Sequence, residues 1–172
     1  MVIIRSKRII LRPLRKEDAE PVTEILKDKG IYKNTTLIPY PYKIRHARDW
    51  INSNLKQYKK NKAVDTFAIE RDGKLIGAIG LSGIIKNHKA ELGYWLGKEY
   101  RGRGIITEAV GLVTKYAFDK LKLKRVSANV FSWNEASKKV LKKNSYKFEG
   151  VLKKYYEKGG KSIDVHLFAK IK

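Results

Sequence analysis

The hydrophobic and polar positions of the chain follow two periods, and each change of period marks a new element. Apolar residues three or four positions apart indicate helices, and strict alternation of apolar and polar residues indicates strands. Helices are expected over 17–29, 47–58, 106–121 and 135–143. Seven strands are expected, over 1–11, 66–71, 74–81, 89–96, 126–130, 148–157 and 162–170.

Turn residues place the boundaries of these elements. Gly30 is expected to close the first helix, whose acidic first turn suits the helix dipole. Asp72-Gly73 is a two-residue hairpin turn. The order is then β-α-α-β-β-β-α-β-α-β-β, an α+β fold with a mixed central sheet, because the strict alternation of a doubly wound fold is absent. At 172 residues, one domain over 1–172 is expected.

Composition excludes several kinds of chemistry. The chain has no cysteine, which excludes disulfides, thiolate metal sites and a cysteine nucleophile. The three histidines follow no metal-ligand spacing, so no metal is expected. No apolar stretch approaches the roughly 20 residues that a membrane span needs. Early charges at Arg5, Lys7 and Arg8 leave no apolar core for a secretory signal, and a cytoplasmic location is expected.

The charge balance is strongly basic. Lysine and arginine total 39 against 17 acidic residues, a formal net charge of +22. Such a surplus attracts nucleic acid, acidic membrane or a phosphorylated small molecule, unless it only reflects the composition of the host's proteins. Residues 17–28 form an acidic island that suits a cationic substrate or is simply a solvated helix face. A basic RNA-binding module is an alternative function, favoured by Tyr155-Tyr156 between lysines, although no known RNA-binding motif is legible.

A glycine-rich turn carries the most specific chemistry. It reads Arg101-Gly102-Arg103-Gly104 and joins a strand to a long helix. Glycines let the backbone approach a ligand, the helix start offers unsatisfied N–H groups, and two guanidiniums add positive charge. The segment therefore predicts a pyrophosphate site. It lacks the third glycine of a dinucleotide fingerprint and the Lys-Ser/Thr pair of a P-loop, and an ordinary strand–helix turn remains an alternative.

This turn resembles motif A of the GNAT N-acetyltransferases, [Q/R]-x-x-G-x-[G/A]. Arg101 and Gly104 match the motif, whereas Ile106 departs from its last position. The resemblance is to the RimJ/RimL-like branch and covers nearly the whole chain. Further matching segments are Ile10-Leu11-Arg12-Pro13-Leu14, Gly93-Tyr94-Trp95-Leu96, Asn134–Ser137 and Tyr146–Gly150. The resemblance implies a three-layer α/β/α fold with a mostly antiparallel seven-stranded sheet, and acetyl-CoA-dependent transfer without a metal.

The resemblance also implies where the cofactor binds. In this family acetyl-CoA occupies a V-shaped opening between the fourth and fifth strands. Pantetheine would then lie along the backbone of Tyr94, Trp95 and Leu96, with an N–H near Leu96 stabilising the oxyanion. The pyrophosphate would bind the backbone amides of Arg101, Gly102, Arg103, Gly104, Ile105 and Ile106.

Catalytic roles follow from the same resemblance. Many members use a tyrosine as general acid at the position of Leu141, so the role passes to Ser137 or, alternatively, to Tyr146. Asn134 would bind pantetheine or fix Ser137, and it is also a good N-cap residue. Glu91 is the candidate general base, acting through water, unless it is a surface carboxylate paired with lysine.

The acceptor is less closely defined. The branch acetylates protein N-termini, notably of ribosomal proteins, and relatives modify polyamines and other small amines. The net charge of +22 repels a free polyamine at long range, while it suits an enzyme that associates with ribosomal RNA. Relatives often form homodimers, so a homodimer is an expectation too. A GNAT fold that binds acetyl-CoA without turnover is a further alternative, because Leu141 and Ile106 depart from the family pattern.

Overall fold

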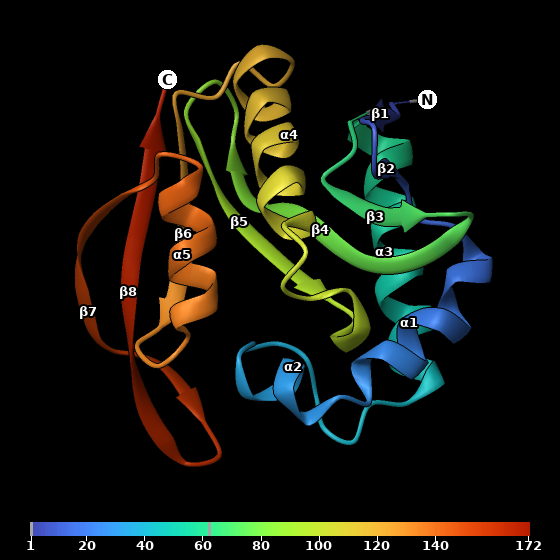
Figure 1. The fold of residues 1–172 in the computed structure, drawn as a ribbon, viewed down its shortest axis with the longest axis horizontal. Helices are drawn as coiled ribbons and strands as arrows, with labels where there is room; N and C mark the ends of the chain where they lie inside the picture. Colours follow the sequence, from blue (N-terminus) through green and yellow to red (C-terminus); the bar gives the residue numbers. More distant parts are fainter. Residues whose placement is uncertain (1, 62) are drawn as a thin grey trace. The chain divides into compact units, whose positions relative to one another are not determined.

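Strands and helices follow one another in nearly the order that the hydrophobic pattern predicts (Figure 1). The computed structural model describes residues 2–61 and 63–172. They fall into two compact units. The first unit holds the chain up to Gly80 together with Tyr94–Ala109, and the second holds Leu81–Gly93 and Val110–Lys172. The expectation of one domain over 1–172 stays a prediction.

An antiparallel sheet with the strand order β1-β2-β3-β4 forms the centre of the first unit. Its strands are β1 (Ile4–Arg5), β2 (Ile10–Pro13), β3 (Thr66–Arg71) and β4 (Lys74–Ile85), of which the end from Leu81 on belongs to the second unit. Asp72 and Gly73 form the predicted turn between β3 and β4. Both have positive φ, 50° and 74°, as the favoured two-residue hairpin turn requires.

The strand expected over the first eleven residues is two strands. Ser6 interrupts it, because its amide donates to the Ile9 carbonyl at 3.0 Å and its hydroxyl donates to the same oxygen at 3.1 Å. The chain therefore turns back and β1 pairs with β2. The described residues thus form eight strands rather than seven. Pro13 does not stop β2 but is its last residue, paired with Phe67.

The helices of the first unit are η1 (Lys16–Asp18), α1 (Ala19–Leu26), α2 (Lys29–Lys33) and α3 (Ile44–Asn61). The prediction of a single helix over 17–29 is wrong about where that helix ends. α1 stops at Leu26, and Asp28 starts α2 because its carboxylate accepts from the Gly30 amide at 2.7 Å. Gly30 consequently lies inside a helix instead of closing one.

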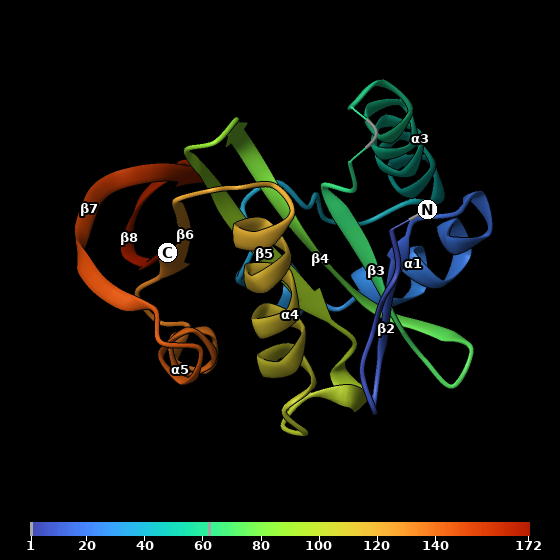
Figure 2. The same ribbon diagram turned by 90° about the horizontal axis from the view of Figure 1, so that it is seen from above.

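Helices α1 and α3 lie side by side and pack against β3 and β4 (Figure 2). The apolar stripe predicted for the second helix faces this core. Of its five members, Ala47 and Ile51 are buried in one hydrophobic cluster with Val22 and Leu26 of α1, and Trp50 and Leu55 are partly buried and pack against that cluster. The fifth member, Tyr58, does not belong to it. Burial of these side chains supplies the main stabilisation that holds α1 and α3 on the sheet.

Strands β5 to β8 form the sheet of the second unit. They are β5 (Lys89–Leu96, of which Tyr94–Leu96 belong to the first unit), β6 (Arg125–Phe131), β7 (Lys147–Lys158) and β8 (Lys161–Ile171), in the order β5-β6-β8-β7. β5 and β6 run parallel, whereas β6, β8 and β7 pair antiparallel. The predicted mixed, mostly antiparallel sheet is therefore confirmed.

The remaining elements are η2 (Lys98–Tyr100), α4 (Ile105–Asp119) and α5 (Glu135–Lys143). The bounds of α5 and of β5 agree with those read from the sequence. None of the helices that the structure describes is long and apolar enough to cross a membrane.

Candidate active site

The glycine turn lies in the first unit, between η2 and α4. Gly102 and Gly104 have φ of 74° and 73°, a left-handed conformation that glycine adopts without a steric penalty. The first helical hydrogen bond of α4 runs from the Glu108 amide to the Gly104 carbonyl at 3.1 Å. Within the described chain, the amides of Gly104, Ile105 and Ile106 carry no hydrogen bond to another residue. The turn thus presents a row of free donors at a helix start, where an anion is stabilised.

Arg101, expected as a pyrophosphate ligand, binds the protein itself. Its guanidinium donates to the Leu96 carbonyl through Nε at 3.1 Å and Nη2 at 3.0 Å, and Nη2 also donates to Asp28 Oδ2 at 2.6 Å. Its amide donates to the Lys98 carbonyl at 3.3 Å. Arg101 therefore ties the turn to the end of β5 and to the start of α2.

Asp28 is the carboxylate at the start of α2 that binds the Arg101 guanidinium. Burial alone would raise the pKa of this carboxyl group, but the hydrogen bond from the Gly30 amide and the Arg101 guanidinium more than compensate and lower it. Asp28 is thus held as a carboxylate that caps α2 and fixes Arg101. Sequence reasoning assigned Asp28 to the acidic island and did not foresee this contact.

A third arginine at the turn, besides Arg101 and Arg103, was not predicted from the sequence. Arg8 lies between β1 and β2, far from the turn in sequence. Its Nε donates to Glu108 Oε2 at 2.6 Å, and its Nη1 donates to the Arg103 carbonyl at 2.9 Å. No local pattern signals this contact, because 95 residues separate Arg8 from Arg103.

The end of β5 approaches β4 closely in the first unit. The Gly97 amide donates to the Ile76 carbonyl at 2.9 Å. A Cβ atom on Gly77 would lie 2.5 Å from the Trp95 carbonyl oxygen, so only glycine fits there. Trp95 also packs near Trp50 of α3, with ring centroids 6.2 Å apart.

The parallel pairing of β5 with β6 is short. It covers Lys89 to Glu91 on β5 and Arg125 to Ser127 on β6, and it stops there although both strands continue. The segment Tyr94–Leu96, expected to line the pantetheine, therefore lies beyond the last paired residue.

Glu91, the candidate base, lies in the second unit in a polar cluster. Tyr156 Oη donates to Glu91 Oε1 at 3.4 Å, and Asn129 is a second hydrogen-bond partner of the carboxyl group. Burial raises the pKa of Glu91, and these two hydrogen bonds oppose the rise. Among the described residues Glu91 makes no salt bridge with lysine, unlike the surface carboxylate of the alternative interpretation.

Asn129 and Tyr156 were not predicted as site residues. Alternation in β6 does place Ser127 and Asn129 on the same face, and the β5–β6 register sets Glu91 beside Ser127. Tyr156 comes from β7, 65 residues away from Glu91 along the chain, and only the folded sheet brings it near.

Asn134 and Ser137 come together at the start of α5, also in the second unit. The Ser137 amide donates to Asn134 Oδ1 at 3.1 Å, so Asn134 is the N-cap of α5. The N-cap interpretation is confirmed, and the capping bond fixes the position of Ser137. The catalytic roles of both residues stay predictions.

Tyr146, the alternative general acid, is part of the core. Only 2% of it is exposed, and its hydroxyl shares a 2.7 Å hydrogen bond with Thr114. Burial raises the pKa of Tyr146 to about 12. Leu141, at the position of the family's tyrosine, is fully buried. These observations favour Ser137 over Tyr146.

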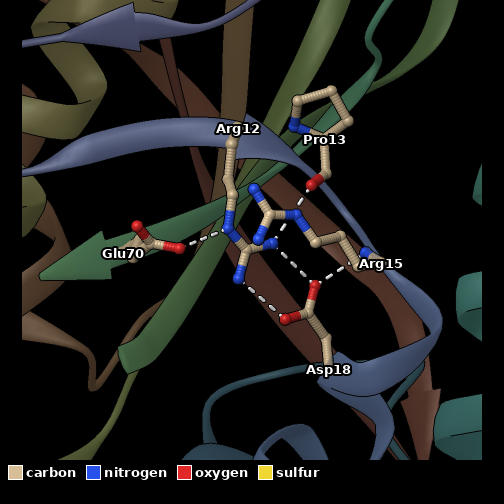
Figure 3. A network of polar contacts seen from close by, with 5 residues as sticks. All are labelled: Arg12, Pro13, Arg15, Asp18 and Glu70. Carbon is tan, nitrogen blue, oxygen red and sulfur yellow. Dashed lines mark hydrogen bonds and ion pairs between the residues drawn. The ribbon is translucent and has the colours of Figure 1, made fainter. Parts of the chain in front are cut away.

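Most of the acidic island is engaged in ion pairs within the first unit. Asp18 forms a bidentate pair with the buried Arg12, both bonds 2.8 Å long, and Arg12 Nε also donates to Glu70 at 2.5 Å (Figure 3). Glu24 pairs with Lys27 at 2.6 Å. A cavity of about 650 Å³ adjoins these residues, and its lining includes Glu17, Asp18, Glu24, Glu70, Glu99 and Tyr100.

The chain is similar to known acetyltransferases. The family model for the acetyltransferase (GNAT) domain matches residues 8–147. The uncharacterized N-acetyltransferase p20 of Bacillus licheniformis is 31% identical over 175 residues, covering 100% of this chain and 97% of that protein. The ribosomal-protein-serine acetyltransferase of Escherichia coli (strain K12) is 30% identical over 126 residues, covering 73% of this chain and 70% of that protein. The solved structure of Mycobacterium smegmatis RimJ in complex with CoA-disulfide has a TM-score of 0.83 at 28% identity, covering 95% of this chain and 81% of that one.

The chain therefore belongs to the GNAT acetyltransferase family. It is an acyltransferase whose co-substrate is acetyl-CoA, and the resemblance to the RimJ/RimL-like branch is confirmed. This result favours an enzyme over the alternative of a basic RNA-binding module.

Proposed function

We propose that the enzyme acetylates protein N-terminal α-amines by direct attack of the amine on acetyl-CoA. The observation that carries the cofactor site is the row of free amides at Gly104, Ile105 and Ile106. They are the donors that a pyrophosphate requires, and the positive end of α4 reinforces them. The similarity to a ribosomal-protein-serine acetyltransferase supports a protein N-terminus as the acceptor.

Glu91 removes the proton that the ammonium acceptor must lose, through a water molecule. The neutral amine then attacks the thioester carbonyl, and a backbone N–H near Leu96 stabilises the oxyanion. Collapse of the intermediate breaks the C–S bond, and Ser137 protonates the departing CoA thiolate. The nitrogen of the new amide loses its remaining extra proton in the same step, and that proton restores the Ser137 hydroxyl. The raised pKa of Glu91 supports its role, because a base with a pKa nearer to neutrality is better matched to an amine's proton.

An acceptor screen that measures CoA thiol release tests this proposal. One peptide carries a free N-terminal serine, and its matched control has the same sequence with the N-terminus already acetylated and an internal lysine retained. We expect thiol release with the free peptide and none with the blocked one. Spermidine and free amino acids are compared at equal concentration. Turnover with spermidine alone would assign the enzyme to small-amine acetylation instead.

A further inference from the structure

Arg8 contacts the glycine turn and the start of α4 although it is not part of the glycine motif. The side chain is 46% exposed, yet three of its nitrogens are engaged. Nε and Nη2 bind Glu108 Oε2 at 2.6 and 2.5 Å, and Nη1 donates to the Arg103 carbonyl at 2.9 Å. The planar guanidinium presents its N–H donors from three separate nitrogens in a fixed fork, whereas a lysine would have to reach the carboxylate and the carbonyl from a single nitrogen.

The bond to the Arg103 carbonyl determines where the next amide points. Arg103 C=O and Gly104 N–H belong to the same peptide plane and point in opposite directions in a trans peptide. Because Arg8 binds the carbonyl oxygen, the Gly104 amide is directed away from Arg8. Residue 104 is a glycine with φ of 73°, and a glycine backbone has more conformational freedom than that of a residue with a Cβ.

The ion pair with Glu108 has a second effect at the same place. Glu108 lies in the first turn of α4, where its carboxylate would repel a bound pyrophosphate. Arg8 neutralises that carboxylate. One side chain thus orients a donor toward the anion and cancels a nearby negative charge.

We propose that Arg8 is a positioning residue for the pyrophosphate of acetyl-CoA, acting through the Arg103–Gly104 peptide and Glu108. The inference rests on the proposed cofactor site. It makes a specific prediction, because S-acetylpantetheine carries the same thioester but lacks the pyrophosphate and adenosine. Loss of Arg8 should impair the use of acetyl-CoA and leave the use of S-acetylpantetheine unchanged.

The test compares wild type, Arg8→Gln, Arg8→Lys and the matched control Lys7→Gln, which removes one charge from the neighbouring exposed residue. We expect Arg8→Gln to raise KM for acetyl-CoA about tenfold, with kcat and the kinetics with S-acetylpantetheine unchanged. Arg8→Lys keeps the charge opposite Glu108 but replaces the fixed fork by a single nitrogen, which weakens the hold on the Arg103 carbonyl. Its KM for acetyl-CoA should therefore lie between those of wild type and Arg8→Gln. Lys7→Gln should match wild type.

Two outcomes would overturn the inference: an unchanged KM for acetyl-CoA in Arg8→Gln, or an equal loss with both thioesters accompanied by a lower Tm. The second pattern would show a merely structural role. If Arg8→Gln does not fold, Arg8→Lys decides by the same comparison of the two thioesters. A wild-type enzyme that does not use acetyl-CoA would contradict the proposed function itself, which separates the two failures.

Discussion

Glu91 shows how a single residue acquires its chemistry from its neighbours. Burial raises the pKa of the carboxyl group, so a larger share of it is protonated in mildly acidic solution than in a solvated glutamate. A general base works only when ionised. Activity should therefore fall as pH drops through this raised pKa and recover as pH rises.

Glu91→Gln should remove that acidic limb of the pH–rate profile. The amide cannot accept the proton, so kcat should fall by about 10²- to 10⁴-fold. Binding of acetyl-CoA, measured by isothermal titration, should not change. Wild-type turnover with an unaltered profile would exclude Glu91 from the mechanism.

Tyr156→Phe gives a second test, for which the direction of the shift in the pKa of Glu91 is predicted. The tyrosine hydroxyl lowers the pKa of Glu91 by donating to its carboxylate, against the rise that burial causes. Its removal should raise the pKa further and shift the acidic limb of the kcat profile to higher pH. A shift to lower pH, or none, would contradict the hydrogen bond between the two side chains.

Ser137 and Tyr146 make a matched pair for the general acid. Ser137→Ala should slow transfer by roughly 10- to 100-fold if the hydroxyl protonates the thiolate. Tyr146→Phe should leave kcat unchanged but lower the free energy of unfolding by about 1 kcal/mol, since it removes the buried bond to Thr114. A slow Tyr146→Phe enzyme beside a fast Ser137→Ala enzyme would reverse the assignment.

At the scale of elements, one buried ionic network joins β2, β3 and η1. Arg12 of β2 is 5% exposed and binds both Asp18 of η1 and Glu70 of β3. Arg15 adds its backbone amide, which donates to Asp18 at 2.7 Å, so the chain leaving β2 is fixed before α1 begins (Figure 3). The network thereby sets where the first helix starts.

Arg12→Met should test the importance of this network. The substitution keeps an unbranched side chain but leaves two carboxylates without their partner, which should lower the free energy of unfolding by about 3–5 kcal/mol. Lys16→Met is the control, because Lys16 is exposed and its loss should change stability by less than about 0.5 kcal/mol. Urea denaturation of the two variants measures the difference. Equal midpoints would show that the network contributes little.

Elements whose signals are local were predicted well. Asp72-Gly73 defines its hairpin, and Asn134 begins α5, because turns and caps depend on neighbouring residues alone. Elements whose limits depend on contacts made elsewhere were not. The Ser6 turn splits one strand into two, and Asp28 ends α1 early because its carboxylate caps the next helix.

The site was predicted to a similar extent. The glycines of residues 101–104 identify the anion-binding turn from sequence because helix starts and positive φ leave local signatures. The residues that orient this turn or surround Glu91 leave no local signature in the sequence. Arg8, Asn129 and Tyr156 reach their partners across the fold. For Arg101, the position in the motif is recognisable from the sequence, but the bond to Asp28 is not.

At the scale of the whole molecule, the net charge of +22 complements an anionic co-substrate and attracts other polyanions as well. Specific binding of the pyrophosphate at the glycine turn must therefore be distinguished from general attraction of anions to a basic surface. The described amides at the start of α4 make that distinction measurable, because each is a separate probe.

The most direct measurement is a titration of the ¹⁵N-labelled protein with CoA and, separately, with pantetheine, followed by amide resonances. We predict saturable shifts of the Gly104, Ile105 and Ile106 amides with CoA, persisting at 0.3 M salt, and no comparable shifts of these amides with pantetheine, which lacks the pyrophosphate. Shifts confined to the lysine-rich segment 138–161, or disappearing in salt while these three amides stay unmoved, would contradict the account.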